Sequence, residues 1–215
     1  AGLLACGRIV RGAFERMREA AVPGISTREL DRIGAEHLAR HDTRSAPQLF
    51  YDFPGATCIS VNEHAAHGIP GDYRLRPGDM VNIDVSAEHR GYVTDMGESF
   101  VVGGSANDAG ERICNAVKEA VLQSIGTIAP GASLNVIGRE VQKIADRERY
   151  TIVRNLGSHG VGASIHETPS YVPFDNPSET RQLTEGMVFT IEPFFSTGTD
   201  WVNQLDDGWT LAVPA

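Results

Sequence analysis

Long hydrophobic runs are missing from this 215-residue sequence. No apolar stretch approaches the roughly 18 residues that a bilayer-spanning helix needs, and Ala1 opens into a mixed helical pattern rather than a signal peptide. Cysteine is also scarce, since Cys6, Cys58 and Cys114 lie far apart and form no C-x-x-C pair. An odd, sparse set of cysteines fits a reducing cytoplasm better than a disulfide scaffold. We therefore expect a cytoplasmic protein.

Basic residues are in the minority, with 19 Lys and Arg against 28 Asp and Glu and a formal net charge of −9. This balance argues against a nucleic-acid-binding surface. It suits cations or the ammonium end of a peptide, although many proteins without such a role are equally acidic. The H-E-x-x-H motif, the Walker loop and the G-x-S-x-G motif are all absent. No cysteine has the glycine-flanked, helix-starting context expected of a thiol protease.

Hydrophobic residues make up 41% of the sequence, which is enough to fill a core, and no linker divides the chain. Apolar periodicity and turn signals predict helices over residues 4–20, 26–40, 107–126 and 133–148, and strands over 57–61, 80–85 and 92–102. The remainder, from residue 151 to residue 213, is expected to form strands and glycine-rich turns. Two helix starts are well marked: Ser26 forms a capping box with Glu29, and Ser133 follows Pro130–Gly131.

A weak internal repeat relates the two halves of the chain. Residues 23–26 (Pro-Gly-Ile-Ser) recur with one change at 130–133, 107 positions later, and His67–Pro70 is echoed by His166–Pro169. Four further positions match 108 residues apart: Leu75, Gly78, Ile83 and Asp84 with Leu183, Gly186, Ile191 and Glu192. Three matches in one order predict a duplicated αβ unit. The repeated His, Asp and Glu are residue types that a site between the halves would use.

Residues 80–102 predict an acidic hairpin. Val81, Ile83 and Val85 alternate with polar residues, so Asp84 lies on the polar face of its strand. A turn centred between His89 and Arg90 would place Asp84 directly opposite Asp95, with Cβ atoms about 5 Å apart. Two carboxylates so placed repel unless one is protonated or a cation lies between them. A register shift, or one Asp facing water, would remove that need.

Histidines near glycine and proline turns form a second group of candidates, namely His64, His67, His159 and His166. Each could equally be a loop imidazole bonded to the backbone, whereas His37, His41 and His89 are expected at the surface. Glu192 ends the apolar run Met187–Ile191, which we expect to be a strand, and a buried acid there needs a partner. Asp, His and Glu together suit Mn, Fe, Co or Zn rather than a soft thiolate site.

Five motifs in this sequence resemble those of the methionine aminopeptidases, most closely the bacterial type I enzymes. They are Cys58–Glu63 with His67–Pro70, Val81–Val85 with Asp95, Ser158–Gly162, Ile165–Pro169 and Phe189–Pro193, and Asp207–Thr210 resembles the stretch before a last motif. The resemblance runs in order over nearly the whole chain. It implies an α+β pita-bread fold, in which two pseudo-symmetric αβ halves surround a central curved, mainly antiparallel sheet.

The resemblance also implies roles for individual residues. Two divalent metal ions (Mn, Fe, Co or Zn) would be held by Asp84, Asp95, His159 and Glu192, with Asp95 bridging. The catalytic groups would be Glu192, as base or proton shuttle, and His67 and His166, as hydrogen-bond partners of the reacting amide. The pocket for the substrate's first side chain would contain Phe50, Phe53, Cys58, Ile165 and Trp209. Plain core packing is the alternative explanation for Phe50 and Ile165.

The resemblance implies a metalloaminopeptidase that would remove methionine from the N-terminus of peptides and nascent chains. We expect one catalytic domain over residues 1–215, acting as a monomer without nucleic-acid or membrane partners. The family's second glutamate ligand would follow Ala215, so we expect a C-terminal segment to be missing and one metal, or none, in this chain. Ser158 and Val93–Met96 also depart from the family pattern. An X-Pro dipeptidase or creatinase-type hydrolase, or a non-catalytic pita-bread binding protein, remains an alternative.

Overall fold

The computed structural model describes residues 1–104 and 107–214, and its contacts divide the chain into two compact units. Unit 1 comprises Ala1–Glu111, Val161–Ile165 and Asn203–Ala212, and unit 2 comprises Arg112–Gly160, His166–Val202 and the residues from Val213 onward. Each unit has its own buried apolar clusters. Among the described residues, no helix is both long and apolar enough to cross a membrane.

Unit 1 begins with two helices, α1 (Gly2–Ala20) and α2 (Thr27–Arg40). The predicted capping box starts α2: Ser26 Oγ accepts from the Glu29 N–H at 3.2 Å, and the Glu29 carboxylate accepts from the Ser26 N–H at 2.9 Å. The expectation that His37 lies at the surface was wrong, because its ring is buried against α1. Gly12 provides the space, since a Cβ at that position would lie 2.8 Å from His37 Nε2.

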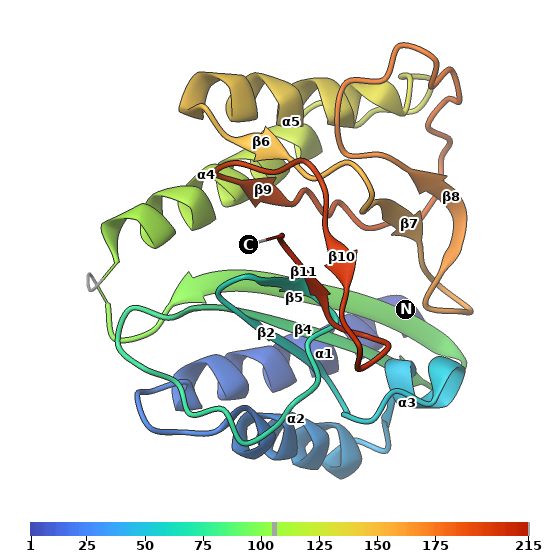
Figure 1. Ribbon diagram of the computed structural model, residues 1–215. Helices are drawn as coiled ribbons and strands as arrows, with labels where there is room; N and C mark the ends of the chain where they lie inside the picture. The colour runs from blue at the N-terminus through green and yellow to red at the C-terminus, as the bar shows by residue number, and fades with distance from the viewer. Residues whose placement is uncertain (105–106, 215) are drawn as a thin grey trace. The chain divides into compact units, whose positions relative to one another are not determined.

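The sheet of unit 1 contains β1 (Arg44–Ser45), β2 (Cys58–Val61), β4 (Met80–His89) and β5 (Tyr92–Val101). Strand β4 is central, since β1 and β2 pair with one of its edges and β5 pairs with the other. Val81, Ile83 and Val85 are fully buried in the same apolar cluster as the inner residues of α1. Helices α1 and α2 lie on that face of the sheet (Figure 1). The alternating pattern of β4 therefore leaves its polar residues on the opposite face.

The turn between β4 and β5 lies one residue later than expected. Arg90 and Gly91 form it, with φ angles of 53° and 84°, and His89 pairs with Tyr92. Two consecutive residues with positive φ are the mark of a tight hairpin turn whose twist matches its strands. Glycine at the second turn position favours this register over a turn centred on His89 and Arg90.

Unit 1 is completed by one short helix and a small sheet. Helix α3 (Ala46–Tyr51) begins at Ser45, whose Oγ accepts from the Gln48 N–H. Strand β11 (Leu211–Ala212) pairs with both β3 (His64–Ala66) and β10 (Asn203–Gln204). Residues far apart in the sequence are thereby held in one unit.

Unit 2 contains most of α4 (Asp108–Ile125) and all of α5 (Asn135–Glu148). Its strands are β6 (Thr151–Ile152) paired with β9 (Phe195–Ser196), and β7 (Ser158–Gly160) paired with β8 (Glu167–Tyr171). The predicted strand at 187–191 was wrong, because that segment makes only an isolated bridge between Phe189 and Gly160. Leu134 rather than Ser133 is the N-cap of α5, although Ser133 Oγ accepts from the Asn135 N–H at 3.2 Å.

Matching hydrogen bonds support the predicted duplication within each unit. The N–H of Gly24 donates to the carbonyl of Leu75 at 2.7 Å, and the N–H of Gly131 donates to the carbonyl of Leu183 at 2.8 Å. Both glycines have positive φ, 96° for Gly24 and 83° for Gly131, and each precedes the second long helix of its half. The residues that match in sequence therefore make the same local structure twice.

Candidate metal centre

Asp84 and Asp95 lie on the same face of the β4–β5 hairpin. The prediction that they oppose each other was wrong, because Asp84 pairs with Gly97 and Asp95 pairs with Ser86. They are diagonal neighbours instead, a relation in which Cα atoms are about 7–8 Å apart and long side chains still interact. Gly97 has no side chain to fill the place opposite Asp84, and a Cβ there would lie 3.6 Å from the Asp84 Cβ.

Cys58 lies on the other side of Asp84, as its direct partner on β2. Burial raises the pKa of the Cys58 thiol well above its usual value, and the negative charges of Asp84 and Asp95 raise it further. Burial and neighbouring carboxylates both favour the neutral thiol, so Cys58 is a buried, uncharged neighbour of Asp84. The role of Asp84 and Asp95 as metal ligands stays a prediction.

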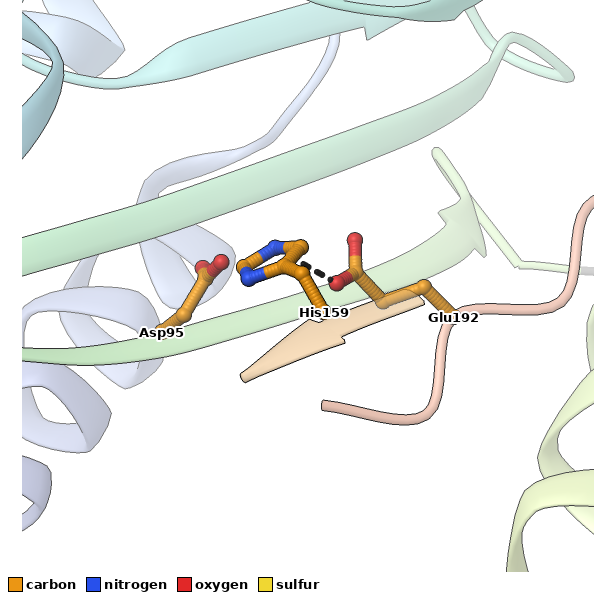
Figure 2. A group of neighbouring side chains, drawn as sticks. All are labelled: Asp95, His159 and Glu192. Carbon is orange, nitrogen blue, oxygen red and sulfur yellow. Dashed lines mark ion pairs between the residues drawn. The ribbon is translucent and has the colours of Figure 1, made fainter. Parts of the chain in front are cut away.

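His159 and Glu192 are brought together within unit 2, although they lie 33 positions apart in the sequence. His159 Nε2 lies 3.0 Å from Glu192 Oε1 (Figure 2, dashed line). The other ring nitrogen, Nδ1, lies 2.9 Å from the carbonyl oxygen of Gly160. A carbonyl only accepts hydrogen bonds, so Nδ1 carries the proton and donates it. In a neutral ring, Nε2 then presents a lone pair to the carboxylate.

Two lone pairs 3.0 Å apart require a cation between or beside them. A proton would make His159 an imidazolium ion, and a divalent metal ion would accept both donors as ligands. Glu192 Oε1 is buried and forms no hydrogen bond with the described residues. A buried carboxylate oxygen without a hydrogen bond is energetically unfavourable. The nitrogen and oxygen donors of this pair therefore fit the ligands of a metal ion. Asp95, the third side chain drawn in Figure 2, belongs to β5 of unit 1.

The two predicted catalytic histidines have different surroundings. The ring of His166 packs edge-on against His159, with centroids 4.3 Å apart. His67 is exposed and has a φ of 54°, in the left-handed region that non-glycine residues rarely adopt. The next residue packs closely on β2, since a Cβ at Gly68 would lie 2.3 Å from the carbonyl oxygen of Ile59. Strain of this kind is concentrated at functional sites.

All five predicted pocket residues belong to unit 1. Phe53 is buried and meets the Trp209 ring edge-on at a centroid distance of 5.2 Å. Ile165 belongs to a small buried cluster with Ala46, Val93 and Val161. Phe50 is 37% exposed on α3 and is therefore not a core residue.

Sequence reasoning underrated Ser158. Its hydroxyl accepts a hydrogen bond from the backbone N–H of Glu192 at 2.9 Å. The sequence contains no local signal for this contact, because the two residues are 34 positions apart. The one sequence feature that could have drawn attention to position 158 is a serine among the glycines of Asn155–Gly162.

Comparison with known proteins places this geometry in a family. The model of metallopeptidase family M24 matches residues 1–212. Methionine aminopeptidase 2 of Bacillus subtilis is 41% identical over 219 aligned residues, which cover 99% of this chain and 86% of the relative. Methionine aminopeptidase from Escherichia coli is 35% identical, with 95% of this chain and 78% of the relative covered.

Solved structures agree with the sequence comparison and confirm the pita-bread fold expected from the resemblance. The structure of methionine aminopeptidase from Rickettsia prowazekii matches with a TM-score of 0.91 at 31% identity, covering 97% of this chain and 84% of that one. Prolidase from Pyrococcus horikoshii matches less well, with a TM-score of 0.73 at 25% identity over 89% of this chain and 53% of that one. The chain therefore belongs to metallopeptidase family M24, among the methionine aminopeptidases.

Proposed function

We propose that this protein is a metal-dependent aminopeptidase that removes methionine from the N-terminus of peptides and nascent proteins. The observation that carries the proposal is the 3.0 Å approach of His159 Nε2 to the buried Glu192 Oε1, two groups of the kinds that ligate metal ions. The relatives named above supply the substrate class, because they are methionine aminopeptidases. Their similarity to this chain covers nearly its whole length.

We assign Asp84 and Asp95 of unit 1, and His159 and Glu192 of unit 2, as the residues that would hold divalent metal ions. These carboxylate and imidazole donors suit Mn, Fe, Co or Zn. Such ions lower the pKa of a bound water toward neutrality and so supply a nucleophile. Glu192 would be the proton acceptor, because its buried Oε1 forms no hydrogen bond with the described residues. The protein side of the chemistry is then to hold the peptide and to move this proton.

Two histidines would orient the scissile amide. Both His67 and His166 are exposed, and the ring of His166 packs against the proposed ligand His159, so their rings are accessible to a bound peptide. Hydrogen bonds to the developing oxyanion and to the leaving nitrogen lower the barrier because they strengthen as charge develops. The apolar side chains of Phe53, Cys58 and Trp209 suit the thioether of methionine.

Kinetics of a single variant test the role of Glu192. We expect Glu192→Gln to lower kcat/KM on a Met-Ala-Ser tripeptide by about 100-fold or more, because both a ligand and the proton acceptor are lost. Glu185→Gln is the matched control, an exposed glutamate seven positions earlier in unit 2. Equal activity of Glu192→Gln and Glu185→Gln would exclude the assignment. Faster turnover of Xaa-Pro dipeptides than of the Met peptide would favour the prolidase alternative.

We also propose that the protein works as a cytoplasmic monomer. All three cysteines are free thiols, as a reducing compartment would keep them. Sedimentation of the purified protein at micromolar concentration should give the mass of one chain, and a stable dimer would contradict this proposal.

A further inference from the structure

Buried hydroxyl groups hold the backbone that carries Glu192. Ser158 Oγ accepts the 2.9 Å hydrogen bond from the Glu192 N–H, and Tyr171 Oη donates one of 2.5 Å to the carbonyl of Thr190. Ser158 is 1% exposed and Tyr171 is 5% exposed, so neither bond competes with bulk water. Ser158 and Tyr171 are also direct partners on β7 and β8.

His159 is tied to the same segment through Thr190. The Thr190 N–H donates to the His159 carbonyl at 2.8 Å, and the His159 N–H donates to Thr190 Oγ1 at 3.0 Å. Hydrogen bonds on both sides therefore fix the main chains from which the His159 and Glu192 side chains project. The distance of 3.0 Å between His159 Nε2 and Glu192 Oε1 depends on how these two main chains are aligned, because a shift of either one would change the distance.

The residues on either side of Ser158 and His159 show that side chains are excluded from much of this stretch. A Cβ at Gly157 would lie 2.9 Å from the Tyr171 carbonyl oxygen, and one at Gly160 would lie 2.3 Å from the Thr168 carbonyl oxygen. Ser158 has a side chain nonetheless, and its oxygen meets the Glu192 N–H. A residue without a hydroxyl at 158 would leave that donor without its acceptor, which is unfavourable in a buried site.

We propose that Ser158 is a positioning residue for the metal ligands His159 and Glu192, an inference that rests on the proposed function. It acts through the main chain of Glu192, while Tyr171 holds the adjoining carbonyl. Removing a residue that hydrogen-bonds to a metal ligand typically lowers the affinity for the metal by roughly 10- to 100-fold. We expect Ser158→Ala to weaken Co²⁺ binding by about tenfold and to alter the visible absorption spectrum of the bound Co²⁺.

The experiment is a calorimetric titration of the full chain with Co²⁺, together with the spectrum of the Co²⁺-bound protein. Ser124→Ala is the matched control, because Ser124 is also a fully buried serine of unit 2 and its hydroxyl donates to the Ala120 carbonyl at 2.7 Å. That variant should keep the wild-type affinity and spectrum. Ser158→Thr keeps the hydroxyl and should restore both, whereas Tyr171→Phe should weaken binding in the same direction as Ser158→Ala.

The outcomes separate the inference from the function on which it rests. Wild-type affinity and spectrum in a folded Ser158→Ala protein would overturn the positioning role and leave the proposed function intact. Equal losses in Ser158→Ala and Ser124→Ala would overturn it as well, since they would indicate general destabilisation. If the wild-type chain itself bound no Co²⁺, the proposed function and the positioning role would both fail. Should Ser158→Ala not fold, Tyr171→Phe decides by the same criteria.

Discussion

His37 shows at the scale of one residue how burial makes stability depend on pH. Burial lowers the pKa of its imidazole, and the positive groups His41, Arg16 and Arg40 lower it further. The unfolded chain, in which a histidine titrates near pH 6.5, therefore takes up this proton before the folded chain does. The stability that neutral His37 provides is fully present above about pH 6.5 and is lost as the pH falls through the lower, folded-state pKa.

Urea unfolding measured between pH 7.5 and pH 5 tests this. We expect the free energy of unfolding of the wild-type protein to decrease as the pH is lowered over this range. That of the His37→Gln variant should decrease less steeply. Carboxylates whose pKa is lowered, such as those of Glu29 and Glu88, titrate at lower pH and are present in both proteins. Identical slopes would mean that His37 does not control the dependence.

At the scale of elements, the predictions that succeeded depend on neighbouring residues. The start of α2 was predicted because Ser26 and Glu29 are three positions apart and the capping box is local. The turn was missed by one residue and the strand pairing therefore by two, because the register depends on which two residues adopt positive φ, and the Gly91 signal was overlooked. Ser158 and Glu192 meet across 34 residues, so no propensity or periodicity could have paired them.

The turn can be tested through Gly91, whose φ is 84°. Gly91→Ala should destabilise unit 1 by about 1–2 kcal/mol, because a side chain disfavours the left-handed region. Gly71→Ala is the control: its φ is not in that region, and its Cβ would meet only the Ile69 carbonyl oxygen at 3.9 Å. The midpoint of urea unfolding should fall for the first variant only. An unchanged midpoint for Gly91→Ala would show that the turn does not set the register.

At the scale of the whole molecule, a duplicated αβ unit could be predicted from Pro-Gly turns that recur 107 residues apart, and each copy makes the same backbone hydrogen bond. The ligand set was predicted only through the family resemblance, because single Asp, His and Glu residues have common structural explanations. The single catalytic domain stays a prediction, since the described chain divides into two compact units by its contacts.

The central claim is that this chain removes N-terminal methionine with the help of a metal ion. The most direct measurement is mass spectrometry of Met-Ala-Ser incubated with the purified chain after chelation and again after addition of Mn²⁺, Fe²⁺, Co²⁺ or Zn²⁺. We predict free methionine only after metal is restored, and none from the N-acetylated peptide, because the proposed aminopeptidase activity requires a free N-terminus. Release that is unaffected by chelation, or no release with any of the four metals beside an active control enzyme, would contradict the account.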